Sequence, residues 1–134
     1  MKLKELFEST EKSVADLGIE YKGGNFNCYR KELTSLKGAP SHVGGDFYCT
    51  SNRLTSLKDV HRQITEIRGV FACRQNPIKS HVLGLLLIRG ITEIRLDRMH
   101  VEEIVNKHLG KGRAGMLQAQ EELIEAGLEE FAQL

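Results

Sequence analysis

Apolar residues alternate with polar residues in a short segment that returns at regular intervals along the middle of the chain. Residues 23–38 (GGNFNCYRKELTSLKG) recur at 44–59 (GGDFYCTSNRLTSLKD), 21 positions later, and a looser copy occupies 69–78 (GVFACRQNPI). In each copy a Phe and a Cys stand two positions apart, the spacing at which side chains of an extended strand point to the same face. The pattern therefore predicts three short strands that bury their Phe and Cys side chains.

The remaining positions of each copy predict a stacked unit. Leucine pairs such as Leu54 and Leu57 are expected to fill the side of the unit opposite the strand, where the chain returns toward the next strand. Asn52 and Asn76 are expected to turn inward and bond the backbone of the turn that follows the strand. Residues 64–68 and 91–95 share the sequence ITEIR, which predicts a fourth, degenerate copy over residues 88–98. One unit cannot bury its own apolar face, so the stack needs a cover at each end.

Both ends of the chain show the apolar spacing of helices. Residues 2–17 predict an N-terminal helix, or two helices with a restart near Ser9 or Thr10, and a further amphipathic stretch runs from Arg98 to Leu109. Residues 116–134 carry an apolar stripe of Leu117, Leu123, Ile124, Leu128, Phe131 and Leu134. We expect a single domain over residues 1–134, with an N-terminal helical cap (1–18), the repeats (19–98) and a C-terminal helical cap (99–134).

The repeat resembles the leucine-rich repeat, L-x-x-L-x-L-x-x-N-x-L, with about 20–29 residues per unit. The matching positions of the second copy are Phe47, Cys49, Asn52 and Leu54. Gly44 stands where the first Leu belongs, and Lys31 replaces the Asn in the first copy. These residues look like the short repeats of bacterial effector proteins and of uncharacterised bacteriophage proteins. The resemblance implies an α/β repeat, a short leucine-rich-repeat-like solenoid with parallel strands, capped by helices at both ends.

Charge and composition restrict the partners. The net charge is +1, which disfavours bulk nucleic acid and acidic membranes. Residues 114–134 hold five acids and no base, so this acidic end is either a solvated face or a surface that steers a partner or a second copy. The longest apolar run, residues 82–88, is too short to span a membrane. Three cysteines without a signal peptide predict a cytoplasmic protein, in the bacterial host if the chain is phage-encoded.

Among the residues that could form a catalytic or ligand-binding site, the cysteines are spaced as the repeat is spaced, and none of these residues matches a known catalytic or metal-binding motif well. Cys28, Cys49 and Cys73 keep the repeat spacing, which favours core packing over a disulfide or a metal site. Residues 110–115 (GKGRAG) precede a helix, so Lys111 and Arg113 are candidate anion ligands. A helix precedes this segment where the dinucleotide motif needs a strand, and a helix–helix turn is the favoured interpretation. The five histidines form no ligand pair. We expect no cofactor, no metal and no enzymatic activity.

In a leucine-rich repeat the outward side chains of the strands commonly form the binding surface. The resemblance therefore implies a non-enzymatic protein-binding module whose partner is a protein of the bacterial host, such as a defence or regulatory factor. The predicted partner-binding residues are Asn27, Tyr29, Asp46, Tyr48, Thr50 and Arg74. If the fourth copy is in register, the set extends to Glu93, Arg95 and Asp97.

Three alternatives remain open. The partner could dock on the acidic helix through Glu121, Glu125 and Glu129, or the chain could form a homo-oligomer. A nucleic-acid or nucleotide binder would use the basic body and the turn at residues 110–115. This last function is less favoured, because it predicts Lys and Arg clustered with aromatic residues, and here they are dispersed.

Overall fold

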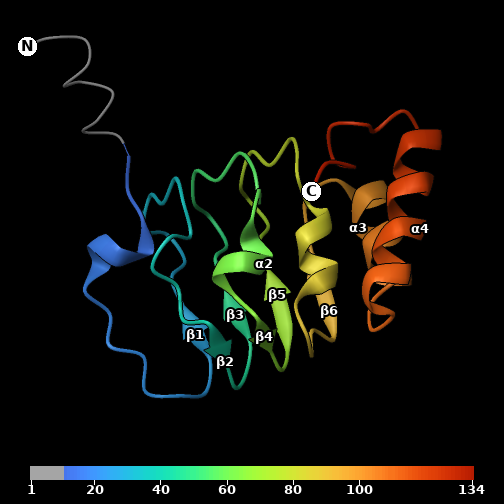
Figure 1. The fold of residues 1–134 in the computed structure, drawn as a ribbon. Helices are drawn as coiled ribbons and strands as arrows, with labels where there is room; N and C mark the ends of the chain where they lie inside the picture. The colour runs from blue at the N-terminus through green and yellow to red at the C-terminus, as the bar shows by residue number, and fades with distance from the viewer. Residues whose placement is uncertain (1–10) are drawn as a thin grey trace, which may run out of the picture.

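The computed structural model describes residues 11–134 and shows a small α/β fold with parallel strands in two sheets (Figure 1). The larger sheet has the strand order β1 (Phe26–Asn27), β3 (Phe47–Tyr48), β5 (Val70–Ala72) and β6 (Glu93–Arg95). The smaller sheet pairs β2 (His42–Val43) with β4 (Glu66–Ile67). The helical elements are η1 (Val14–Leu17), α2 (Val60–Gln63), η2 (Leu83–Leu87), α3 (Met99–Lys107) and α4 (Gly112–Glu125).

The strands of the larger sheet pair in the phase of the sequence repeat. Phe26 lies opposite Phe47, and Phe47 lies opposite Phe71. The row continues to Ile94, which lies opposite Phe71 on the next strand. The fourth copy, expected over residues 88–98, is therefore in register with the other three.

The predicted fold class, a leucine-rich-repeat solenoid with a helical cap at each end, is wrong. The strands are only two or three residues long and belong to two separate sheets. Beyond each of the first three strands of the larger sheet, the residue two positions after the Cys is left-handed: Arg30, Ser51 and Gln75 have φ of 54°, 60° and 59°. The return segments also pair with one another, as β2 and β4 and as isolated bridges, so they form a second sheet.

The predicted N-terminal helical cap is also not seen within the described residues. The first described element is the four-residue 3-10 helix η1, and residues 1–10 of that prediction lie outside the described part of the chain. Residues 12 and 13 instead extend along the first copy, where Lys12 bonds Thr34, and Ala15 of η1 bonds Lys37. Within the described residues, this end carries extended chain and one short 3-10 helix.

The C-terminal end is helical, as expected, with different bounds and a different buried face. Figure 1 shows α3 and α4 at the end of the row of strands, with α3 against β6 and α4 against η2. The last helix begins at Gly112 and ends at Glu125. Its predicted stripe is divided, because Leu123 and Phe131 are buried while Leu117 and Ile124 are 48% and 49% exposed. Among the described residues, no helix combines the length and the apolar character that a membrane crossing needs.

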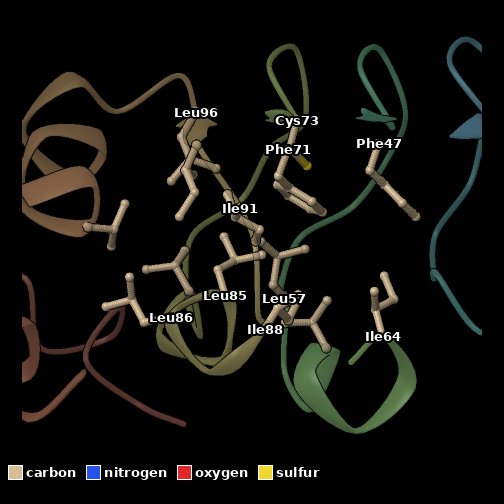
Figure 2. Packing of buried hydrophobic residues seen from close by; sticks show 14 of the residues in the cluster. Phe47, Leu57, Ile64, Phe71, Cys73, Leu85, Leu86, Ile88, Ile91 and Leu96 are labelled. Carbon is tan, nitrogen blue, oxygen red and sulfur yellow. The ribbon is translucent and has the colours of Figure 1, made fainter. Parts of the chain in front are cut away.

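A row of aromatic rings forms one wall of the core. The ring centroids of Phe26 and Phe47 are 5.2 Å apart, and those of Phe47 and Phe71 are 5.4 Å apart in a stacked arrangement. Tyr21 closes the row at its N-terminal end, edge-on to Phe26 at 5.9 Å. Figure 2 shows aliphatic side chains of the return side facing these rings, among them Leu57 and Leu85. Rings at this spacing add about 0.5–1.5 kcal/mol per pair beyond the area they bury.

Two buried asparagines join the copies. The Asn52 amide donates to the carbonyls of Cys28 and Cys49, at 3.0 and 2.9 Å, and its oxygen accepts from the Leu33 N–H at 3.0 Å. Asn76 repeats the arrangement one copy later, donating again to the Cys49 carbonyl at 2.9 Å. The inward turn predicted for both residues is confirmed, and each side chain also bonds the neighbouring copy.

Helix α3 closes the outer edge of β6 with side chains. Asn106 accepts from the Ile94 N–H and donates to the Ile94 carbonyl, both at 2.7 Å. One turn earlier, Glu102 accepts from the Leu96 N–H at 2.8 Å. These bonds satisfy the backbone groups that a fifth strand would otherwise pair with, so the sheet ends here without an open ladder.

We expect Asn106→Ala to lower the free energy of unfolding by about 1–3 kcal/mol, because it leaves both Ile94 backbone groups without a partner. The measurement is the urea midpoint, with Asn106→Asp as an intermediate variant that keeps only the accepting oxygen. Gln118→Ala, at an exposed position on α4, is the control. A midpoint equal to that of the unaltered protein would show that the edge does not depend on this side chain.

The cysteine thiols should react slowly in the folded protein. Cys28, Cys49 and Cys73 are at most 1% exposed. Burial, and secondarily the nearby Cys73, raise the pKa of Cys28 to about 12, and burial raises the pKa of Cys49 well above its ordinary value. Because the thiolate is the reactive form, a thiol reagent at neutral pH should label all three slowly until denaturant is added. Rapid native labelling, or stoichiometric zinc in a metal analysis, would contradict interior packing.

Candidate binding surface on the larger sheet

The outward side chains of the larger sheet form three rows, which we call the strand face. The middle row, fixed by strand pairing, consists of Asn27, Tyr48, Ala72 and Arg95. The row before it consists of Asn25, Asp46, Val70 and Glu93. The row after it consists of Tyr29, Thr50, Arg74 and Asp97. Backbone bonds to the carbonyls of Thr50 and Arg74 keep this row in register. The structure thus places all six predicted partner-binding residues on one surface.

The residues of the strand face differ in exposure. Tyr29 is 48% exposed, and Asn27 and Arg74 are exposed as well. Tyr48 and Thr50 are half-buried. The surface therefore offers large side chains whose rings and stems are partly covered, the condition under which Tyr and Arg dominate binding energies.

Tyr48 is fixed in place by its neighbour Asp46. The Tyr48 hydroxyl donates to Asp46 Oδ2 at 2.7 Å, and Asp46 Oδ1 accepts from the Val70 N–H at 2.7 Å. The hydroxyl bond is the main cause that lowers the pKa of Asp46 and raises the pKa of Tyr48. At neutral pH the pair is a carboxylate beside a neutral phenol, with its geometry set before any partner arrives.

The glycines that precede the strands leave room for the side chains of Asn25 and Asp46. Asn25 Oδ1 accepts from the Asp46 N–H at 2.8 Å, and the Asp46 carboxylate repeats this contact one copy later. A Cβ on Gly45 would overlap the Asn25 side-chain oxygen, and a Cβ on Gly69 would overlap the Asp46 oxygen. Asp46 is therefore mainly a residue that positions the strand face, a role that its place between the double Gly and the Phe could have indicated.

Arg74 is oriented by a residue that the sequence did not single out. Its Nη2 lies 2.9 Å from Glu102 Oε1, and the Glu102 side chain is only 11% exposed. The hydrogen bond to Glu102 raises the pKa of Arg74, so the guanidinium stays charged and directed. Glu102 lies on α3, a separate element, and no spacing in the sequence connects the two residues.

Two further predicted residues also bond the backbone. Asn27 Oδ1 accepts from the Tyr29 N–H at 3.1 Å, and the Thr50 hydroxyl donates to the Ala72 carbonyl at 3.3 Å. The groups left to meet a partner are chiefly the rings of Tyr29 and Tyr48 and the exposed part of Arg74. Arg95, in the fourth copy, stands beside them and forms an ion pair with Glu93 at 2.9 Å.

The alternative acidic surface lies at the other end of the chain. Glu121, Glu125 and Glu129 are exposed, the first two on α4 and the third in the turn that follows it. On the same helix the exposed Leu117 and Ile124 lie seven positions apart, which places them on one face. This surface stays a candidate for a partner or for a second copy.

The segment predicted as a helix–helix turn is confirmed as one, because it joins α3 to α4. Gly110 and Gly112 adopt φ of 77° and 58°, and a Cβ on Gly115 would meet the His108 carbonyl at 2.6 Å. Lys111 and Arg113, the candidate anion ligands, are both exposed. The backbone conformation of Gly110 and Gly112 and the close packing at Gly115 therefore account for the three glycines of this segment.

Basic residues gather around two adjoining clefts of about 440 and 690 Å³. The clefts share the lining residues Thr34, Ser35, Lys37 and Thr55. Lys12, Arg53 and Lys58 add positive charge, while Glu11, Asp16 and Asp59 add negative charge. The nucleic-acid alternative, which rests on the basic body and the turn at residues 110–115, is not tested by this mixed lining and stays a prediction.

Within residues 11–134 no group of three His, Cys, Asp or Glu side chains is placed to hold a metal ion. Comparison with known proteins adds no assignment: no family model, no curated protein and no solved structure matches this chain. Any function must therefore be argued from the surfaces themselves.

A carboxylate that docks α4 on α3 should make stability depend on pH. Glu122 lies 2.5 Å from Lys107 Nζ and 2.6 Å from His108 Nε2. These bonds, first to Lys107 and then to His108, lower the pKa of Glu122. Because the folded pKa lies below the unfolded one, the ionised carboxylate stabilises the fold above its ordinary pKa, and this contribution is lost as the pH falls through the folded pKa.

We therefore expect the urea midpoint to fall more steeply between roughly pH 5 and roughly pH 3 in the unaltered protein than in Glu122→Gln. Glu121→Gln, on the exposed side of α4, should keep the steep fall and is the matched control. Parallel curves for the unaltered protein and Glu122→Gln would refute the assignment.

Proposed function

We propose that the protein is a non-enzymatic binding module that holds another protein on the strand face. The observation that carries this is the register of the larger sheet and of the backbone bonds just beyond it, which brings Tyr48 of β3 onto one surface with Tyr29 and Arg74, the residues that follow β1 and β5. Neighbouring strands lie about 4.8 Å apart, so these side chains form one patch. Tyr and Arg are the residue types that most often anchor protein interfaces.

Preorganisation supports the same function. Hydrogen bonds to Asp46 and Glu102 hold Tyr48 and Arg74 in position. A surface that is already ordered loses less side-chain entropy on binding, at about 0.5–1.5 kcal/mol for each long side chain that would otherwise be immobilised. The charges on the strand face are largely paired with neighbouring side chains, so the face is suited to a partner protein whose surface carries both polar and apolar groups.

The proposed partner is a protein of a bacterial host, with a defence or regulatory factor as the leading class. This part of the proposal rests on the resemblance of the repeats to short bacterial and bacteriophage repeats. The immobilised chain, incubated with bacterial lysate and analysed by mass spectrometry, provides the candidate partner whose purified form is then titrated.

We expect Tyr29→Ala combined with Tyr48→Ala to weaken binding of that partner by about 2 kcal/mol or more, because the patch loses both aromatic rings. Titration calorimetry measures the affinity, and thermal melting verifies that the variant is folded. Arg74→Lys should also weaken binding, because an ammonium cannot keep both the bond to Glu102 and a planar contact to the partner.

Leu117→Ala removes a comparably exposed apolar side chain from α4 and is the control that should keep full affinity. If the tyrosine variant binds as well as the unaltered protein while Leu117→Ala does not, the partner sits on α4. The acidic residues there would then make binding weaken with added salt.

A further inference from the structure

A cleft of about 430 Å³ opens where the turn between α3 and α4 meets the chain that leaves η2. It brings together two segments far apart in sequence, residues 86–91 and residues 110–113. This volume lies in the range of small-molecule sites, which is about 300–1,000 Å³. None of the residues of the strand face lines it.

Two arginines of this cleft have no partner of opposite charge among residues 11–134. Arg89 comes from the segment after η2 and Arg113 from the first turn of α4. Both are exposed, and neither forms an ion pair or a side-chain hydrogen bond with any residue in 11–134. Lys111, the other cation expected in this turn, is not among the lining residues. Two unpaired guanidinium groups in one cleft are suited to a phosphate, which they can bind in a bidentate manner.

The rest of the lining is aliphatic. Leu86, Ile88 and Ile91 are 4–7% exposed and extend from the core that Figure 2 shows, and the half-buried Leu87 completes the apolar part. Among the described residues that line the cleft, none is aromatic and could stack on a base. A branched aliphatic surface beside two cations favours an alkyl chain attached to an anionic group over a nucleotide.

The backbone leaves the anion end of the cleft open. Apart from their own chain neighbours, Gly110 and Gly112 have no described atom within 4 Å of the position that a Cβ would occupy, so the space beside them is open in the described part of the chain. Helix α4 also begins without a side-chain cap, which leaves N–H groups of its first turn free to add to the field of the arginines. On the opposite wall, Gly90 is required because a Cβ would meet the Ile67 carbonyl at 2.5 Å.

We infer that this cleft binds a small amphipathic anion, a phosphate monoester of an aliphatic alcohol. Arg89 and Arg113 hold the phosphate, and the half-buried Leu87 offers the main apolar surface for the alkyl chain. The site is independent of the strand face, so a ligand here and a protein partner there can be tested separately.

The test titrates n-hexyl phosphate into the ¹⁵N-labelled full chain and follows the amide resonances of Gly90, Gly110 and Gly112. We expect saturable shifts at these glycines. Inorganic phosphate, which lacks the chain, and hexanol, which lacks the charge, should each bind at least about tenfold more weakly. Adenosine monophosphate should also bind about tenfold more weakly, because its base finds no stacking partner.

Arg89→Gln and Arg113→Gln should each raise the Kd of hexyl phosphate about tenfold, the usual effect of losing one charge-assisted hydrogen bond. Both side chains are exposed, so the melting temperature should stay unchanged. Arg62→Gln removes another highly exposed guanidinium, on α2, and should leave the Kd as it is. The proposal is overturned if the glycine shifts do not saturate, or if the three variants bind alike.

Discussion

The buried amide of Asn52 is the interaction on which the arrangement of the copies depends. It bonds the Cys28 and Cys49 carbonyls and the N–H groups of Lys31 and Leu33, so one side chain satisfies the backbone of two copies. A buried backbone group without a partner costs about 1–3 kcal/mol. Any shift of one copy against the next would orphan several such groups at once. The stacked phenylalanines and the aligned rows of the strand face both follow from this fixed offset.

The same requirement to satisfy backbone groups explains the C-terminal end. A stack of parallel strands leaves an unpaired ladder at its last strand, and Asn106 and Glu102 of α3 take the place of the missing strand at Ile94 and Leu96. Glu102 also bonds Arg74. One carboxylate therefore closes the sheet edge and directs a side chain of the strand face, which connects the stability of this end to the proposed binding surface.

The sequence predicted the features that recur in every copy, and it did not predict the features that depend on contacts between distant segments. The period-two spacing of Phe and Cys predicted the buried rows, and the position of Asn52 and Asn76 predicted their inward turn. The left-handed conformation of Arg30, Ser51 and Gln75 was not readable, because these residue types carry no preference as strong as that of glycine. Their turns redirect the chain after each strand of the larger sheet, and the segments that follow pair in a second sheet. Nor did the spacing in α4 show which apolar residues face η2, since both Leu123 and Ile124 fit a helical stripe.

The distribution of paired and unpaired charges separates the two proposed sites. On the strand face, Arg74, Arg95 and Asp46 already have partners, so a docking protein meets groups whose desolvation is partly offset by neighbours that remain in place. In the cleft beside α4, Arg89 and Arg113 form no ion pair with any described residue. An anion that enters there meets two positive charges that no described carboxylate neutralises. A protein surface of mixed charge would gain less at the cleft, and a small phosphate would gain less at the strand face. The distribution of charge thus supports two separate proposals, a protein partner for the strand face and a small phosphate for the cleft.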